Sequence, residues 1–372
     1  MSASPAQPVR PDSEQPMSAS PAQPVRPDSE QPMSASPDIR PLWTVRRSGT
    51  RGAATGLLLF GLALFAVPYL FQANVVQQLT TLFIFVILAV MWNALAGYGG
   101  LVSVGQQAFI GFGAYATIFL AQHGVSPYLA VVLAALASAV LAVVVAPLLL
   151  RLRGGQFAVG SWVVAETLAL LVALDEDLGG GTGVSLRGLN VYAPNMRRAY
   201  TYWITLAFVL VLLGLVFFML RHRVGAALQA IRDDEEAAAS LGVRTAPLKF
   251  GLFVLAGFGC GAAGALTLAN TLFIQPQSIF GIQWTAYLLF MVLVGGLGTF
   301  EGPILGAILF FLLQNQFAQQ GAWYLIGLGV VAGGFALFLP RGLWSLLTDR
   351  FHLRILPFGY DLYRPAPVIK ES

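Results

Sequence analysis

Long apolar segments, separated by short polar turns, occupy most of the chain between residues 53 and 339. Each segment has roughly the 20 residues that an α-helix needs to cross the hydrocarbon core of a bilayer. Backbone groups in lipid must hydrogen-bond within their own segment, so these segments are expected to be helices. The period-2 alternation of a membrane β-barrel is absent. The pattern predicts an all-α polytopic membrane protein with about ten crossings, at 53–71, 76–96, 104–122, 127–149, 156–174, 200–220, 249–270, 282–299, 302–318 and 322–339.

Two stretches leave the number of crossings open by one or two. The glycine-rich stretch 97–113 is compatible with a continuous crossing or with a re-entrant or broken helix. The segments at 282–318 are divided only by the short linker GTFEGP.

The first 48 residues follow another pattern. The sequence MSASPAQPVRPDSEQP occupies 1–16, repeats at 17–32 and begins again at Met33. It is rich in Pro, Ser and Gln and has no apolar run to bury, so 1–48 is expected to be a disordered cytoplasmic tail. A tandem duplication near the gene start, with Met17 and Met33 as other initiators, explains it more simply than a docking tail. The expected membrane domain is 49–345, followed by a cytoplasmic tail at 346–372.

The composition agrees with a lipid environment. Hydrophobic residues make up 57% of the chain and charged residues 10%, whereas a soluble domain carries roughly 25% charged residues. Three charged side chains, Arg151, Arg153 and Glu166, lie between Gly52 and Leu174. One cysteine, Cys260, excludes an internal disulfide, and three widely spaced histidines show no ligand spacing. No metal site and no catalytic residue is predicted.

The positive charges predict the orientation. Arg and Lys gather in the loops that an even number of crossings places on the same side as the N-terminus, and such loops are cytoplasmic. The opposite side keeps only Arg187, Arg197 and Arg198. Both termini are therefore expected in the cytoplasm.

The longest cytoplasmic loop, 221–250, has the pattern of two short helices. Its apolar positions Val224, Leu228, Ile231, Ala238 and Leu241 recur at helical spacing. Asp233 and Asp234 stand where they would cap or charge the start of the second helix, which Gly242 would end. The pattern fits a solvated amphipathic connector or a rigid helix presented to a cytosolic partner.

Several motifs in this region and around it resemble those of one transporter family. Glu236-Ala237-Ala238, followed after three residues by Gly242, resembles the EAA-x3-G loop of bacterial ABC importer permeases. The phrase ALQAIRDDEEAAASLGV resembles the LivM-type permeases of the branched-chain amino-acid (hydrophobic amino-acid uptake) family. Five further blocks resemble the family in the same order, and together the blocks cover roughly 90–345: 92–116, 150–159 with Glu166, 179–185, 294–307 and 339–344.

The resemblance implies that the loop at 221–248 is a coupling helix that docks in a groove of a separate ATPase subunit. The residues carried over to this role are Arg232, Asp233, Asp234, Glu236, Ala237, Ala238 and Gly242. The chain contains no G-x-x-x-x-G-K-[ST] phosphate loop, so ATP and Mg²⁺ are expected on the partner and no cofactor in this chain.

Polar residues inside the crossings are the candidates for the substrate pathway. Glu166 is the one acidic residue well inside a predicted crossing, and such a group is either a structural tie or a pathway residue. Gln106 and Gln107 would line the pathway if 97–113 is a broken helix, but the glycines there equally fit close helix packing. Asn93, with Trp92, is either a cavity residue or an interfacial anchor.

The loop at 175–199 is the largest external element. The resemblance implies a periplasmic substrate-binding protein that docks on this face, or else the loop is merely solvated. The candidate docking charges are Asp175, Glu176, Asp177, Arg187, Arg197 and Arg198.

Together with the resemblance, these features predict a permease subunit of the bacterial cytoplasmic (inner) membrane. It would import branched-chain or other hydrophobic amino acids by alternating access. The implied partners are a second, LivH-type permease forming a heterodimer, two cytosolic ATP-binding subunits, the binding protein and the lipid bilayer, with no nucleic acid. A urea or short-chain amide importer of the same architecture is the alternative. A secondary transporter or channel without ATP would carry several intramembrane ionisable residues, where only Glu166 qualifies. A membrane enzyme would need a catalytic set that the sequence lacks.

Overall fold

A computed structural model describes residues 44–47, 61, 63–186, 188–189, 193–339, 342–351 and 360–363. The expected tail 1–48 lies almost wholly outside these residues, as does most of the expected crossing at 53–71. Within the tail, β1 (Thr44–Arg47) pairs with β4 (Tyr360–Tyr363) in a two-stranded sheet. The chain from 47 to 360 forms a separate compact unit, which is helical and carries the features of interest.

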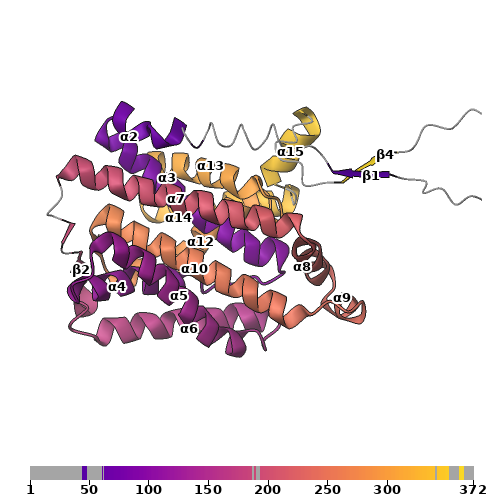
Figure 1. Cartoon of the computed structure of the whole chain (residues 1–372), viewed down its shortest axis with the longest axis horizontal. Coiled ribbons are helices and arrows are strands. Elements are labelled where there is room, and N and C mark those ends of the chain that lie inside the picture. Colours follow the sequence, from indigo (N-terminus) through magenta and orange to yellow (C-terminus); the bar gives the residue numbers. More distant parts are fainter. Residues whose placement is uncertain are drawn as a thin grey trace, which may run out of the picture. The chain divides into compact units, whose positions relative to one another are not determined.

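The helical unit contains long apolar helices joined by short turns (Figure 1). The first half comprises α2 (Val67–Leu70), α3 (Ala73–Asn93), the π-helix η1 (Ala94–Tyr98), α4 (Gln107–Gln122), α5 (Pro127–Leu149), α6 (Gly155–Leu174), the 3₁₀-helix η2 (Gly180–Thr182) and β2 (Val184–Ser185). The second half comprises α7 (Pro194–Arg221), α8 (Arg223–Asp233), α9 (Glu235–Ser240), α10 (Thr245–Thr271), β3 (Phe273–Ile274), α11 (Pro276–Ile279), α12 (Gln283–Gly295), α13 (Gly302–Phe317), the 3₁₀-helix η4 (Ala318–Gln320), α14 (Ala322–Phe338) and α15 (Gly342–Phe351). Helix α15 runs across residue 346, where we expected the C-terminal tail to begin.

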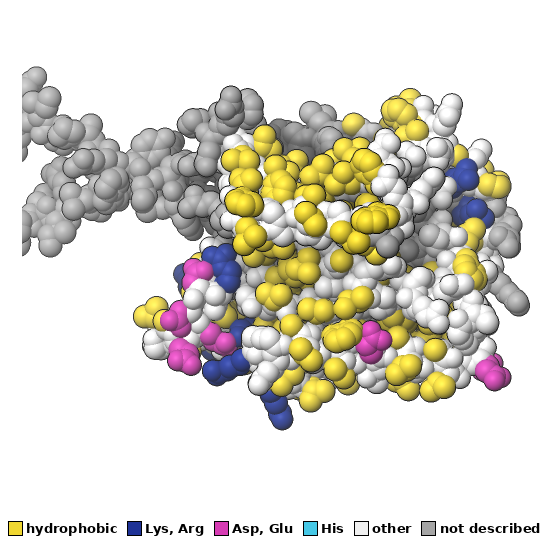
Figure 2. All heavy atoms as spheres, turned by 180° about the vertical axis from the view of Figure 1, so that it is seen from behind, with side chains coloured by type: hydrophobic (Ala, Val, Ile, Leu, Met, Phe, Trp, Pro, Cys, Tyr) yellow, Lys and Arg dark blue, Asp and Glu magenta, His cyan; other side chains and the backbone are white. Residues whose placement is uncertain are grey.

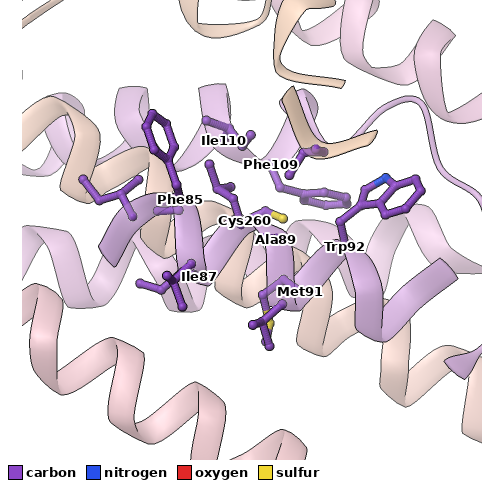
Figure 3. Close-up of a cluster of buried hydrophobic side chains, with 14 of the residues drawn as sticks. Phe85, Ile87, Ala89, Met91, Trp92, Phe109, Ile110 and Cys260 are labelled. Atoms are coloured by element: carbon purple, nitrogen blue, oxygen red, sulfur yellow. The ribbon is translucent and has the colours of Figure 1, made fainter. Parts of the chain in front are cut away.

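Helices α3 and α10 form the centre of the unit. Helix α10 packs on α3, α4 and α5, while α3 also packs on α7 and α13. Figure 3 shows the contact, in which Met91 and Trp92 of α3 lie near Phe109 of α4 and Cys260 of α10. Within the spanning windows of α3 and α10, 83% and 78% of the residues are buried.

Glycine allows these helices to approach so closely. A Cβ atom at Gly264 of α10 would overlap the carbonyl group of Ile110 on α4, and one at Gly261 would overlap Ser138 on α5. In the same way, Gly113 of α4 leaves room for the backbone of Gly261. Small residues at helix crossings bring backbones together where lipid provides no hydrophobic driving force.

The residues that the structure describes contain fewer spanning helices than the sequence pattern predicted for the whole chain. Six described helices are long and apolar enough to cross a membrane, or up to seven if the bent pair Trp323–Phe338 and Gly342–Thr348 is one span. Helices α4 and α13 have 16 residues each, which at 1.5 Å per residue gives about 24 Å, less than the ~30 Å hydrocarbon core. Our expectation of about ten crossings is therefore not confirmed, because hydropathy marks apolar character and not helix length.

The outer helices leave large apolar side chains exposed. They include Val140 and Val144 of α5, Leu170 of α6, Val211 of α7 and Val330 of α14. Figure 2 shows hydrophobic side chains spread over the body, with most charged side chains at its ends and one acidic side chain within the apolar face. This distribution is that of an integral membrane protein.

Candidate coupling site and intramembrane polar residues

The predicted coupling loop folds into two short helices. Helix α8 ends at Asp233, and the side chain of Asp234 then accepts hydrogen bonds from the backbone N–H groups of Glu236 and Ala237, each at 2.9 Å. Asp234 is thus the N-cap of α9, which orders the first turn of a helix of only six residues. Gly242 follows the helix with φ +85°, a left-handed conformation that favours glycine. Of the two aspartates predicted at the start of the second helix, Asp234 is its cap and Asp233 is instead the last residue of α8. The predicted stop at Gly242 is confirmed.

Arg232 points towards the membrane part of the chain. Its Nη1 donates a hydrogen bond of 3.0 Å to the carbonyl oxygen of Gly97 in η1, and its Nε and Nη2 donate to Asp233. Gly298 lies beside the guanidinium, because a Cβ atom there would be 2.9 Å from Nη1. Arg232 therefore ties the coupling loop to the end of the central helix α3.

Asn93 completes this contact from the last turn of α3. Its Nδ2 donates to the carbonyl oxygen of Thr299 at 2.8 Å, and its Oδ1 accepts from the backbone N–H of Gly298 at 2.8 Å. Asn93 is buried and has both ends of its amide satisfied. We call the group formed by Asn93, Gly97, Arg232, Gly298 and Thr299 the Arg232 junction. It joins α8, α3 with η1, and the turn between α12 and α13.

The other candidate coupling residues divide by exposure. Ala238 is 2% exposed, and Leu228 and Ile231 of α8 are buried as well. Glu236 and Ala237 are exposed, and Leu241 at the end of α9 is 84% exposed. We had grouped Leu241 with the apolar face of the loop, so its exposure corrects that expectation, and the same holds for Val224.

Two ion pairs connect α9 to its neighbours. Glu235 pairs with Lys249 in the first turns of α10, while Glu236 lies 3.5 Å from Arg153 between α5 and α6. The side chains of Arg153 and Glu236 are 80% and 86% exposed, so that pair adds little stability. It does place the loops at 150–154 and 221–248 at the same end of the bundle.

The glycine-rich stretch is a broken helix buried in protein. The π-helix η1 ends at Tyr98, residues 99–106 form no α-helix, and α4 begins at Gln107. Gly105 packs against the backbone of Ser161, six residues or about 9 Å inside α6. Non-helical backbone at membrane depth is stable where protein covers it, as it does here. The predicted packing role is confirmed, because Gly97, Gly105 and Gly113 lie close against other segments. The helix is also broken, but a pathway lined by this stretch stays a prediction.

Gln106 and Gln107 are fully buried at the start of α4. Thr285 of α12 donates a hydrogen bond of 2.8 Å to Oε1 of Gln107. Neither polar atom of the Gln106 side chain has a partner among the described residues. In this conformation, Gln106, Gln107 and Asn93 therefore face protein. Trp92 is buried too, with its Nε1 donating to the carbonyl oxygen of Ser103 at 2.9 Å, so the interfacial anchor that we considered for Trp92 and Asn93 is wrong.

Glu166 lies in the middle of α6 on the exposed side of the chain. Nε1 of Trp162 donates a hydrogen bond of 2.9 Å to its Oε1. No ion pair to Glu166 occurs among the described residues, so the structural ion pair that we considered for it is not observed there. A charged residue at the bilayer centre costs roughly 3 kcal/mol when it faces lipid. Among the described residues, Trp162 is thus the one side chain seen to compensate the carboxylate of Glu166.

The external loop is shorter than predicted. Pro194 begins α7, so Arg197 and Arg198 lie in the first turns of that helix instead of in the loop, while Arg187 is outside the described residues. Asp175, Glu176 and Asp177 are exposed after α6. The carboxylate of Asp175 accepts hydrogen bonds from Asp177 and Leu178, which makes it a local turn residue.

The loop is fixed to α10 through β2, which pairs antiparallel with β3, Val184 opposite Ile274. The docking role of its charges stays a prediction.

Comparisons with known proteins identify the family. The model of the branched-chain amino acid transport system / permease component family matches residues 74–340. The chain is 27% identical over 328 residues to the high-affinity branched-chain amino acid transport system permease protein LivM of Salmonella typhimurium, which covers 80% of this chain and 77% of the relative. The LivM protein of Escherichia coli gives the same identity and coverage. No solved structure is significantly similar. The chain belongs to the branched-chain amino acid permease family.

Proposed function

We propose that the chain is the membrane permease subunit of an ATP-driven importer of branched-chain and other hydrophobic amino acids. The observation that carries the ATP-driven part is the capped α9, which presents exposed Glu236, Ala237 and Leu241 while Arg232 is bonded to Gly97. A capped helix transmits displacement, whereas a flexible loop would absorb it. The apolar cargo is supported by the transport system for which the two relatives are named.

In this proposal the exposed side of α9 docks in a groove of a cytosolic ATP-binding subunit. Movement of that subunit displaces α8, and the Arg232 junction passes the displacement to η1 and to the turn between α12 and α13. The irregular backbone at 99–106 is the place where the bundle changes shape. The pathway then opens alternately to either side, with no covalent chemistry in this chain.

The complete importer would contain four kinds of chain. A second, LivH-type permease closes the pathway, two ATP-binding subunits supply the energy, and a periplasmic binding protein delivers the amino acid. ATP and Mg²⁺ belong to the partner subunits. The cytoplasmic membrane and cytoplasmic termini follow from the positive charges at the end of the bundle that holds α8 and α9.

The experiment is uptake of radiolabelled leucine and urea by cells that lack the chain and by cells in which it is restored. Leucine uptake should be lost in cells that lack the chain and should return in cells in which the chain is restored. Charge reversal by Glu236→Lys, or Leu241→Asp, should prevent the return while the amount of chain in the membrane stays normal. Loss of urea uptake alone would identify urea as the substrate and would leave the proposed importer role unchanged.

Co-purification with the ATP-binding subunit separates coupling from transport. Glu236→Lys should reduce the ATPase recovered with the permease, whereas Asp177→Lys, an equal reversal on the external loop, should leave it unchanged. Normal ATPase recovery and leucine uptake in both α9 variants would overturn the assignment of α9.

A further inference from the structure

Helix α6 has one buried and one exposed side. Phe157, Ser161 and Ala165 face the protein. The opposite side carries residues that recur at three- and four-residue spacing and are all exposed, which we call the Glu166 stripe: Gln156, Val159, Val163, Glu166, Thr167 and Leu170. Only 17% of the spanning window of α6 is buried among the described residues, so the stripe faces away from the rest of the chain.

A comparison with α5 shows what lipid-facing positions look like here. The large exposed side chains of α5 include Leu136, Val140 and Val144, and all its exposed positions are apolar. Its one serine, Ser138, is turned inward and buried. The Glu166 stripe differs, because a carboxylate, an amide and a hydroxyl residue interrupt its apolar side chains. Such a surface suits water or another polar surface.

Glu166 lies near mid-membrane depth, because it is 11 residues from the start of α6, which corresponds to about 16 Å. The indole N–H of Trp162 orients the carboxylate through Oε1. Since that donor is neutral, the negative charge stays uncompensated by any ion pair among the described residues. Val163 and Leu170, each one turn from Glu166, are 55% and 66% exposed. The stripe therefore offers one anionic point between apolar surfaces.

We propose that the Glu166 stripe lines the translocation pathway and that Glu166 receives the ammonium group of an amino acid whose apolar side chain lies against Val163 and Leu170. A zwitterion with an apolar side chain matches this arrangement, because its cationic end compensates the carboxylate. The proposal rests on the transport function proposed above. It adds the segment of the chain that the substrate meets.

Accessibility in membranes that hold the whole transporter tests the position of the stripe. Leu170→Cys and Val140→Cys form a matched pair, at 66% and 63% exposure on α6 and α5. The native Cys260 is fully buried and serves as a silent background. A membrane-impermeant, charged methanethiosulfonate should modify Leu170→Cys at least about tenfold faster than Val140→Cys, because only a pathway surface is wet. Leucine should slow that reaction. Equal, slow modification of both would overturn the proposal.

Transport by Glu166 variants tests the carboxylate. Glu166→Gln keeps the size and the bond from Trp162 but removes the charge, and it should lower leucine uptake about tenfold or more. Glu166→Asp should retain part of it, and the amount of both variants in the membrane should stay normal. Unchanged uptake by Glu166→Gln, or a parallel loss of chain from the membrane, would overturn the role in binding. Failure of the α9 variants to affect ATPase recovery would refute the coupling role and leave this pattern of labelling intact.

Discussion

Helices α6 and α10 have nearly the same mean hydropathy, yet they occupy opposite environments. In their spanning windows, 17% of the residues of α6 and 78% of those of α10 are buried within the chain. The difference lies in small residues of α10. Gly264 lies against the backbone of Ile110 on α4, and Gly257 and Gly261 lie against the small side chains of Ala142 and Ser138 on α5. Hydropathy thus indicates which helices can lie in a membrane, and closely packed glycines indicate which of them form the centre of the bundle.

The largest effect should come from filling the close contacts of α10. Gly264→Val would drive a side chain into the carbonyl group of Ile110, and backbone cannot move aside as a side chain can. We expect loss of monodisperse protein in fluorescence-detected size-exclusion chromatography. Gly251→Val on the same helix is the control, because a Cβ atom there meets no described atom within 4 Å. Equal behaviour of the two variants would refute the role of glycine in packing.

Truncation of a large side chain should lower the stability much more on α10 than on α6. Phe253 of α10 is 1% exposed and packs edge-on against Phe109, with ring centroids 5.6 Å apart. Phe253→Ala should cost about 3–5 kcal/mol of stability, whereas Leu170→Ala on α6 should cost less than about 0.5 kcal/mol. Thermal unfolding of the two purified variants measures the difference. A destabilised Leu170→Ala would mean that the outer side of α6 is buried by this chain after all.

Removing the hydrogen bonds of Asn93 tests whether packing of small residues alone holds α3 against the turn between α12 and α13. Asn93→Ala leaves the N–H of Gly298 and the carbonyl of Thr299 without their partner, at about 1–3 kcal/mol for each if buried. The loss should be smaller than for Phe253→Ala, because this turn is only partly buried and admits water. Asn315→Ala, at an exposed position of α13, should leave the melting temperature unchanged. A neutral Asn93→Ala would show that glycine packing suffices.

Ser161 should give the smallest effect, because it attaches α6 to the centre by one hydrogen bond. Its hydroxyl accepts from the backbone N–H of Val104 at 3.2 Å. Ser161→Ala should cost about 1 kcal/mol, and Ser161→Thr should restore part of it. Hydrogen exchange of the 101–106 backbone measures this locally. If the protection is unchanged in Ser161→Ala, the hydrogen bond does not hold α6, and the contact of Gly105 with Ser161 is what attaches it.

Local signals explain which parts could be predicted from the sequence. The two helices of the coupling loop followed from helix formers, an N-cap aspartate and a stop glycine, all of which act within a few residues. The number of crossings could not be predicted, because two of the segments counted as crossings fold as 16-residue helices with enough hydropathy for a longer one.

The environments of the candidate polar residues were harder still to predict from the sequence. Asn93 is an amide residue at a helix end, which is typical of an interfacial anchor. Its hydrogen bonds to Gly298 and Thr299, some 200 positions away, show instead that it is internal. Arg232 matched a motif thought to face a partner, but its hydrogen bond to Gly97 spans 135 positions. Contacts of such sequence separation leave no periodic trace.

The strand pair β2–β3 gives α10 a further property. Strand β3 follows α10 almost directly, after Leu272, and holds the external loop through Val184 and Ile274. At its other end, Lys249 of α10 is paired with Glu235 of α9. With 27 residues, α10 extends about 40 Å. One continuous helix thus links the β2–β3 pair at one end of the bundle to α9 at the other, so a displacement of either end can be passed along α10 to the opposite end.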